Sequence, residues 1–268
     1  MTSKEKDPVI LEVSEGIATL TLNAPETLNA LSEVVLDALQ TALSGLAGDQ
    51  EVKAVILRGA GAHFCAGHNL KEMTARRADP DGGSLYFNDL FARCSRMMMT
   101  IVNLPQPVIA EVSGIATAAG CQLVATCDLA IASEEARFAT SGVNIGLFCS
   151  TPMVALTRNI SRKQAMEMLL LGDFIPATRA AELGLVNRVV PLDELATASR
   201  DMARRIVEKS PVAIKIGKRA FYEQAGMTLE DAYAYAGRTM AHNMMARDAE
   251  AGIGAFVSKK PMPAWRGD

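Results

Sequence analysis

The chain has 268 residues with 27 basic and 30 acidic side chains, which gives a formal net charge of −3. No cluster of lysine and arginine alternates with aromatic residues as a phosphate-tracking groove requires, so nucleic-acid binding is disfavoured. The length allows one large domain or one domain with a small appendage. The 49% apolar content, with 20 glycines added, exceeds the usual ~45 to 50% and suggests additional surface buried between subunits.

The ends and apolar stretches of the sequence indicate a cytoplasmic protein. Residues 1–8 mix both charge signs and lack the features of a signal or transit peptide. The longest weakly polar segment, Val112 to Cys127, contains polar residues and is shorter than the ~20 apolar residues of a membrane span. Five cysteines without a Cys-x-x-Cys pattern fit reduced thiols.

The first part of the chain alternates predicted strands with helices. Residues 9–13 and 16–23 show the period-two pattern of a strand hairpin. Ser32 caps an amphipathic helix that ends near Gly48. Strand, small-residue turn and helix then recur, which predicts an α/β domain. The further predicted strands are 53–58, 107–112 and 128–132.

The second part is predicted to be mainly helical. Residues 161–164 have capping-box form ahead of a helix that stops at Gly172. Breaks at proline and glycine then separate helices in the last ~70 residues, whose methionine stripes are more typical of packing than of a ligand tunnel. Residues 76–99, which contain Pro-Asp-Gly-Gly, are expected to be mobile. The remaining elements are a strand at 186–190 and helices at 192–209, 211–224 and 229–245.

Two loops of small residues, 61–73 and 114–123, each leave a strand and enter a helix. Backbone N–H groups near Ala66 and Gly67, and those at the start of the second helix, can face one cleft. Two such donors can hold one oxyanion. The same small residues also permit close packing of helix on strand, and this use is more common.

Four motifs, at residues 22–31, 61–73, 114–128 and 256–261, are similar in order and spacing to the enoyl-CoA hydratase/isomerase (crotonase) superfamily. Within it the sequence most resembles the branch called enoyl-CoA hydratase domain-containing protein three. The resemblance implies an α/β fold in which residues 1–197 form a spiral of ββα units with the acyl-CoA site. Residues 198–268 would form a helical trimerisation region, giving a homotrimer or a dimer of trimers.

The resemblance also implies a site for fatty acyl-CoA thioesters, with no further cofactor. The backbone N–H groups of Ala66 and Ala119 would hold the thioester carbonyl and stabilise an enolate. The residues expected to line this site are Leu28, Ala66, Gly67, His68, Asn69, Leu70, Gly120, Gln122, Ser141, Gly142 and Lys259.

The sequence departs from the superfamily at the two glutamates that activate water in the hydratases. These positions hold Gln122 and Gly142, which neither donate nor accept a proton near neutral pH. A glycine at position 142 also resembles the naphthoyl-CoA synthases, in which bicarbonate takes the place of the missing glutamate carboxylate. Thr140 departs from the pattern of those enzymes. His68 is an alternative proton relay by its pKa. Equally, His68 and Asn69 shape a turn and a helix start.

Other reactive residues fit structural roles better. The three histidines offer no convergent metal site. Cys149 has no histidine placed beside it by any motif, so a packed thiol is favoured over a nucleophile. Glu111 and Asp128 are expected to make structural hydrogen bonds. Lys259 and the lysine after it either neutralise coenzyme A phosphates or are solvated tail residues.

Three functions therefore stay open. The first is an acyl-CoA-binding protein of fatty-acid metabolism with weak hydratase activity. The second is a reaction that needs a single proton relay: double-bond isomerisation, thioester hydrolysis or decarboxylation. The third is a non-catalytic acyl-CoA sensor or interaction subunit.

Overall fold

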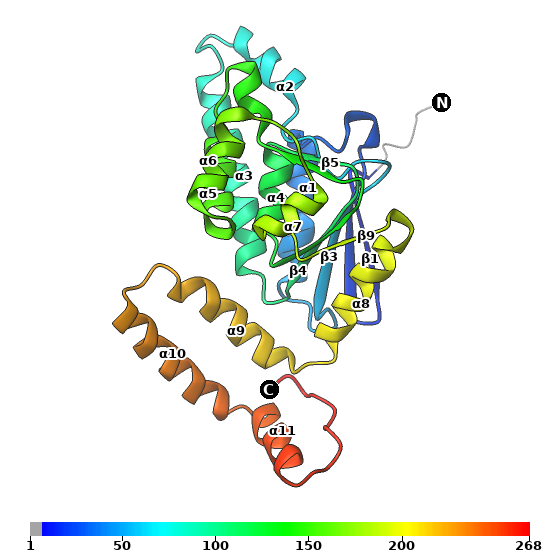
Figure 1. The fold of residues 1–268 in the computed structure, drawn as a ribbon, viewed down its shortest axis with the longest axis vertical. Helices are drawn as coiled ribbons and strands as arrows, with labels where there is room; N and C mark the ends of the chain where they lie inside the picture. Colours follow the sequence, from blue (N-terminus) through cyan, green and yellow to red (C-terminus); the bar gives the residue numbers. More distant parts are fainter. Residues whose placement is uncertain (1–6) are drawn as a thin grey trace.

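The computed structural model describes residues 7–268 (Figure 1). The chain begins with the predicted hairpin, in which β1 (Val9–Ser14) pairs antiparallel with β2 (Ile17–Leu22). Glu15 and Gly16 make the turn with positive φ angles of 55° and 76°, as a two-residue hairpin turn requires. The expectation that no targeting signal is present concerns residues that lie largely outside the described part.

A six-stranded sheet in the order β1-β2-β3-β4-β6-β9 forms the centre of the molecule. All neighbouring pairs except β1 and β2 are parallel. A second sheet, in the order β5-β7-β8, lies beside it. The bounds are β3 Ala54–Gly59, β4 Val108–Val112, β5 Ile115–Thr117, β6 Leu129–Ser133, β7 Arg137–Ala139, β8 Ile175–Pro176 and β9 Arg188–Val190. The predicted α/β class is confirmed.

Helices bury both faces of the main sheet, as parallel sheets require. On one face, α1 (Glu33–Leu46) starts at Ser32, whose hydroxyl accepts from the backbone N–H of Val35 at 3.2 Å. On this face α3 (Ser84–Asn103) packs against α1. The expectation of a mobile segment is wrong from Ser84 onward, because this helix buries Leu90, Cys94 and Met97 in the core.

The opposite face of the sheet is covered by α8 (Leu195–Val207), which buries Ala203 against Ile17 and Ile56. This helix crosses the predicted domain boundary at residue 197. The helices that stand apart from the sheet in Figure 1 therefore begin after it. They are α9 Pro211–Gln224, α10 Leu229–Met244 and α11 Arg247–Val257.

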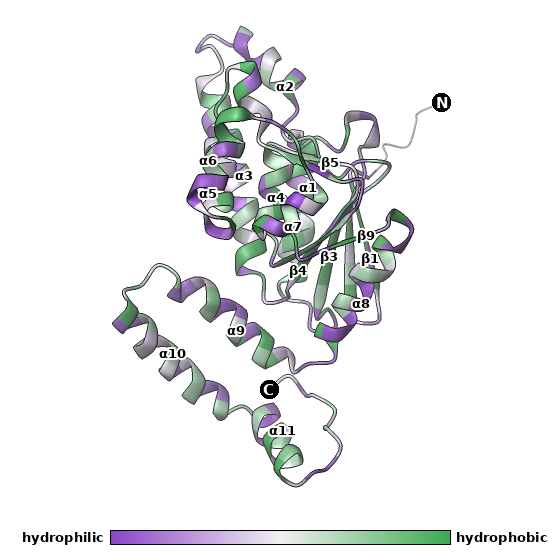
Figure 2. Ribbon diagram, viewed as in Figure 1, coloured by the Kyte–Doolittle hydropathy of each residue, from purple (hydrophilic) through white to green (hydrophobic). Residues whose placement is uncertain are grey.

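The C-terminal helices are tied to the α/β body by a partly buried polar cluster around Asp128. Lys218 of α9 donates to Asp128 at 2.7 Å and to two backbone carbonyls, and Tyr222 donates to the other oxygen of the same carboxylate. By contrast, α9 and α10 bury no residue of their own, and Figure 2 shows apolar positions distributed along them. Within residues 7–268, no helix is both long and apolar enough to cross a membrane.

Short helices connect these layers and shape the loops. The predicted cap of α6 forms differently, because Ser161 donates to the Gln164 side chain instead of accepting from the backbone. Gly172 ends that helix at φ 67°, as predicted. The remaining elements are η1 Pro25–Thr27, α2 Leu70–Ala75, η2 Arg76–Ala78, α4 Ala119–Thr126, η3 Ser141–Ile145, α5 Ser150–Asn159, α6 Arg162–Leu171, α7 Ala177–Leu183 and η4 Leu192–Glu194.

Candidate active site

The two loops singled out in the sequence meet directly. Cys65 and Ala116 form a parallel bridge. The Cys65 amide donates to Ile115, and its carbonyl accepts from Thr117, both at 3.0 Å. A side chain on Gly120 would overlap the Cys65 carbonyl. The small residues therefore do permit close packing, and this packing brings the backbone of the two loops into one place.

The second loop presents a free amide at the start of α4. Ala118 precedes the helix with φ 50° and ψ −118°, a conformation that an L side chain rarely adopts. After this turn, the N–H of Ala119 begins the helix and has no hydrogen-bond acceptor within residues 7–268. Such a donor, at the positive end of a helix, suits an oxygen that gains negative charge.

The first loop presents a different amide from the one expected. The N–H of Ala66 donates to the carbonyl of Leu28 at 3.0 Å, so this donor is already used. The expectation that Ala66 faces the cleft is wrong because its strand-like segment pairs with residues 28–31. The bridge between Leu31 and His68 continues this pairing through the carbonyl of Gly67.

The same pairing turns the N–H of His68 away from Leu31. In a parallel bridge one residue bonds to the neighbours of its partner, so the partner's own N–H points to the opposite side. The His68 amide has no acceptor in the described part of the chain. The second loop lies beside the preceding residue, because a Cβ built on Gly67 would be only 3.2 Å from the Ala119 nitrogen. The two unused amides therefore lie in touching loops.

The His68 side chain is buried among apolar groups. Both ring nitrogens lack a hydrogen-bond partner among the described residues. The ring meets Phe91 of α3 edge to face, with 5.6 Å between centroids. Burial lowers the pKa of this imidazole below its usual value of 6.5, although the Leu31 backbone partly opposes the shift. The imidazole is consequently neutral near pH 7 and has a free lone pair.

Asn69 starts the short helix α2, as the structural interpretation predicted. Its side-chain oxygen accepts from the backbone N–H groups of Lys71 and Glu72 at 3.1 and 3.4 Å. Its side-chain nitrogen donates to the Glu72 carboxylate at 3.1 Å. The side-chain oxygen and one N–H of Asn69 are thus used in shaping this turn.

Gln122 lies one helical turn after Ala119. It is 5% exposed, and its Oε1 has no hydrogen-bond partner within residues 7–268. A buried amide oxygen without a partner is costly unless a water or ligand satisfies it. Gln122 therefore offers a neutral polar contact beside the free Ala119 amide.

Gly142 offers nothing comparable. A Cβ at this position would overlap the carbonyl of Leu147 and lie 2.9 Å from the Cys149 sulfur. The space that a side chain at this position would need is therefore filled. Next to it, the Ser141 hydroxyl is paired with Thr117 at 2.9 Å.

Three other predicted residues lie outside this cluster of contacts. Leu28 contributes its carbonyl to the first loop, while its side chain is 41% exposed. Leu70, the first residue of α2, is half exposed. Lys259 follows α11, at the opposite end of the molecule from α2 in Figure 1, so one protomer does not bring it to the two loops.

The remaining reactive residues have structural roles, as predicted. Burial raises the pKa of the Cys149 thiol, which argues against a nucleophile. Glu111 accepts from Ser199, and Asp128 holds the backbone of Val108 at 2.7 Å. His63 accepts from the Ile115 amide at 3.2 Å.

Sequence reasoning missed the contribution of α3. Phe91 contacts His68, and the buried Tyr86 hydroxyl, with no partner in the described residues, lies on the same helix. The helical periodicity of 84–103 was the available signal, but the glycines before it suggested mobility instead.

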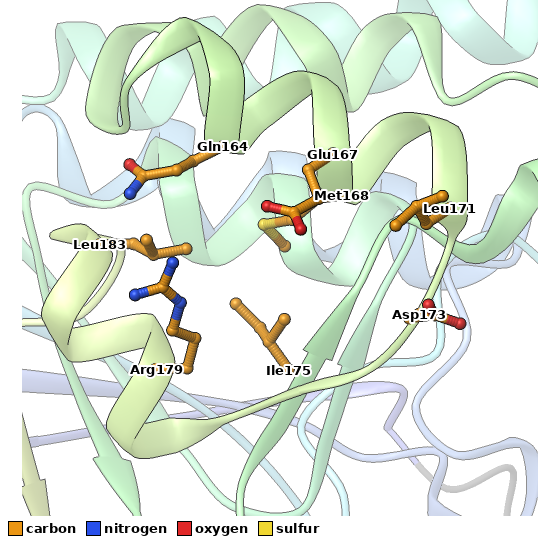
Figure 3. A pocket seen from close by; sticks show the side chains of 8 residues that line it. All are labelled: Gln164, Glu167, Met168, Leu171, Asp173, Ile175, Arg179 and Leu183. Carbon is orange, nitrogen blue, oxygen red and sulfur yellow. The ribbon is translucent and has the colours of Figure 1, made fainter.

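A hollow of about 220 Å³ lies elsewhere, between α6 and α7 (Figure 3). Its wall combines the Glu167 carboxylate and the Arg179 guanidinium with aliphatic side chains such as Ile175. Arg179 already pairs with Glu182 at 2.8 Å. None of the predicted thioester-site residues lines this hollow.

Comparison with known proteins identifies the family and the fold of this chain. Residues 12–268 match the family described as enoyl-CoA hydratase/isomerase. The chain belongs to the enoyl-CoA hydratase/isomerase family. A solved enoyl-CoA hydratase from Mycobacterium smegmatis is 52% identical with a TM-score of 0.92, over 96% of this chain and 99% of the other. The predicted crotonase fold is confirmed.

The resemblance to one branch of the enoyl-CoA hydratase/isomerase family is also confirmed. Enoyl-CoA hydratase domain-containing protein 3 from Xenopus laevis is 43% identical over 96% of this chain and 85% of its own length. The solved human protein of that name is 42% identical with a TM-score of 0.91, over 96% of this chain and 100% of the other.

The expectation of a cytoplasmic protein is contradicted by these relatives. The proteins from Xenopus laevis and Homo sapiens carry the printed designation mitochondrial. The cysteine content could not distinguish the cytoplasm from mitochondria, because both compartments are compatible with reduced thiols.

Proposed function

We propose that the protein binds fatty acyl-CoA thioesters and polarises their carbonyl group with the backbone N–H groups of His68 and Ala119. The observation that supports this proposal is the pair of unused amides in touching loops. Two donors in a water-poor site stabilise the oxyanion of an enolate, and one such donor is typically worth ~10² to 10³ in rate. Both are backbone groups, so replacing the side chain at 68 or 119 leaves the donor in place.

Water addition across the double bond is expected to be weak. It needs an acid and a base near the β-carbon. Gln122 can hold a water but cannot transfer a proton, and the space beside Gly142 is filled by Leu147. The protein thus keeps the thioester chemistry of its family but lacks the groups that complete hydration.

A single proton relay remains in place, which favours double-bond isomerisation. The neutral His68 imidazole takes a proton from the α-carbon of a 3-enoyl thioester, and the negative charge moves to the carbonyl oxygen held by the two amides. The imidazolium then returns the proton to the γ-carbon, giving the conjugated 2-enoyl thioester. No atom is gained or lost, and no second acid is required.

Kinetics with two substrates test this function. We expect conversion of 3-hexenoyl-CoA to its conjugated isomer, measured by absorbance. Crotonyl-CoA should be hydrated more slowly than the ~1 to 10³ per second usual for enzymes. Hydration within that range would contradict the proposal. Binding of both thioesters with no product from either would contradict the isomerase and identify a non-catalytic acyl-CoA binder.

We also propose that the functional unit is a homotrimer or a dimer of trimers. The support is the unburied apolar surface of the C-terminal helices, where Phe221, Tyr233 and Phe256 are 67 to 75% exposed. Monomeric proteins rarely expose so many large apolar side chains together. Light scattering on the purified protein should give three or six times the mass of one chain, whereas a monomer would contradict this assignment.

A further inference from the structure

Residues 28–31 and 66–69 run side by side, and this pairing includes the backbone of His68. Leu28 accepts from Ala66 at 3.0 Å, Leu31 donates to Gly67 at 2.7 Å, and Leu31 accepts from Asn69 at 3.4 Å. The longest of these hydrogen bonds is therefore the one just after His68, at the start of α2. The direction in which the His68 N–H points depends on this end of the pairing.

Beyond the hydrogen bond from Asn69 to Leu31, the side chain of Glu72 connects the same two segments. The Glu72 carboxylate accepts from the backbone N–H of Glu33, the first residue of α1, at 3.1 Å. Its other oxygen accepts from the Asn69 side-chain nitrogen at 3.1 Å. Glu72 thus joins the residue after His68 to the N-terminus of a 14-residue helix that is fixed in the core.

Apolar packing anchors α2 only weakly, because none of its six residues is fully buried and Met73 packs against the core only in part. Two arginines lie at the same end of α1. Arg76 and Arg93 pair with Glu33 at 3.3 and 3.2 Å, which offsets the repulsion between Glu33 and Glu72. The N-terminus of α1 adds partial positive charge.

We propose that Glu72 is a positioning residue that sets the direction of the His68 amide and imidazole toward the bound thioester. This inference rests on the proposed function of the two amides. Glu72 acts through Asn69 and α1 and does not touch the substrate. A shift of about 1 Å in such a donor costs on the order of 10²-fold in rate.

The hydrogen bonds of Glu72 allow its positioning role to be tested separately from its effect on overall stability. Each oxygen of Glu72 faces a donor, so the amide of E72Q must turn its NH₂ group toward one of them. In N69D two carboxylates face each other. In the double variant N69D/E72Q the pattern is inverted but complete: the introduced aspartate still caps α2 and accepts from the introduced glutamine amide, whose oxygen accepts from Glu33.

The experiment uses crotonyl-CoA labelled with ¹³C at the thioester carbonyl and measures its infrared stretch when bound to the full-length protein. The native protein should shift this band to lower frequency. E72Q and N69D should each lose at least half of the shift while circular dichroism stays native, and N69D/E72Q should regain it. E135Q, which alters an exposed glutamate, is the matched control and should keep the native shift.

The outcomes separate the two proposals. No shift with the native protein would contradict the proposed oxyanion site itself. A native shift that both single variants retain, or that the double variant fails to restore, would overturn the role of Glu72. If the single variants unfold, the comparison of native protein with N69D/E72Q still decides, because the inverted network must give the native shift.

Discussion

Residues 122 and 142 occupy the two positions where the resemblance expects glutamates, but their surroundings differ. Gln122 has a buried oxygen without a hydrogen-bond partner in the described part of the chain. At Gly142 the Leu147 carbonyl and the Cys149 sulfur fill the space of any side chain. At the first position glutamine differs from glutamate in one functional group, while at the second the backbone leaves no space for a side chain. Under the proposed function, a change at residue 122 alone would therefore not complete a pair of carboxylates.

The largest effect is expected from G142E, which tests the closed position. The new side chain overlaps the Leu147 carbonyl, so the turn after β7 must open. We expect a loss of more than ~4 kcal/mol in the free energy of unfolding, measured with urea. G45E, at an exposed helical position with open space around it, is the control and should keep or raise stability, by ~1 kcal/mol at most, because glutamate is the better helix former. A stable G142E would show that the position is not closed.

His68→Ala tests whether the His68 imidazole is the group that transfers the proton. Isomerisation of 3-hexenoyl-CoA should fall by ~10² to 10⁴, the usual contribution of a general base. The affinity for butyryl-CoA should be unchanged, because the backbone amide remains. The exposed His242→Ala is the control. Unchanged turnover in His68→Ala would remove the imidazole from the mechanism.

The pH dependence of the native enzyme follows from the same residue. The base must be neutral, and burial lowers the pKa of His68 below 6.5. Turnover should therefore be constant near pH 7 and fall only as the pH drops through this lowered pKa. An acidic limb with a midpoint above 6.5 would contradict the assignment.

A smaller effect is expected from A118G at the turn that presents the Ala119 amide. Ala118 has φ 50°, which costs ~1 to 3 kcal/mol for a residue with a Cβ. Glycine relieves this strain but makes the unfolded chain more flexible, so we expect a net gain of ~1 kcal/mol in unfolding free energy. A225G, at a residue with an ordinary negative φ, should lose stability. A loss in A118G would contradict the strain.

The smallest effect is expected from Q122E, which tests the open position. Its oxygen has no hydrogen-bond partner to lose among the described residues, so the loss of stability should be smaller than in Q106E, and one carboxylate without a second should leave crotonyl-CoA hydration weak. Gln106 is the matched contrast, since it is also 5% exposed but donates to three carbonyls. Q106E should therefore lose ~3 kcal/mol or more. Rapid hydration by Q122E alone would contradict the account.

Local patterns in the sequence predicted most of the fold. The alternation in the first hairpin, the Ser32 cap and the Gly172 stop depend on neighbouring residues, and the structure confirms each of them. The Ser161 cap failed because its hydroxyl found a side-chain partner instead of the backbone.

The site was predicted less completely because it depends on contacts between distant segments. The loop around Ala66 was found from its small residues, but which amide is free depends on pairing with residues 28–31. Likewise, the closing of position 142 by Leu147 depends on a turn conformation that a single glycine does not reveal. The role of Glu72 needs both α1 and α2 in place.

The central claim is that the amides of His68 and Ala119 together hold the thioester oxygen. A crystal structure of the complex with butyryl-CoA tests it most directly. The account predicts that the carbonyl oxygen lies ~2.7 to 3.1 Å from both backbone nitrogens, with the Ala66 N–H still bonded to Leu28. A carbonyl oxygen that contacts neither nitrogen, or that displaces Leu28 to reach Ala66, would contradict it.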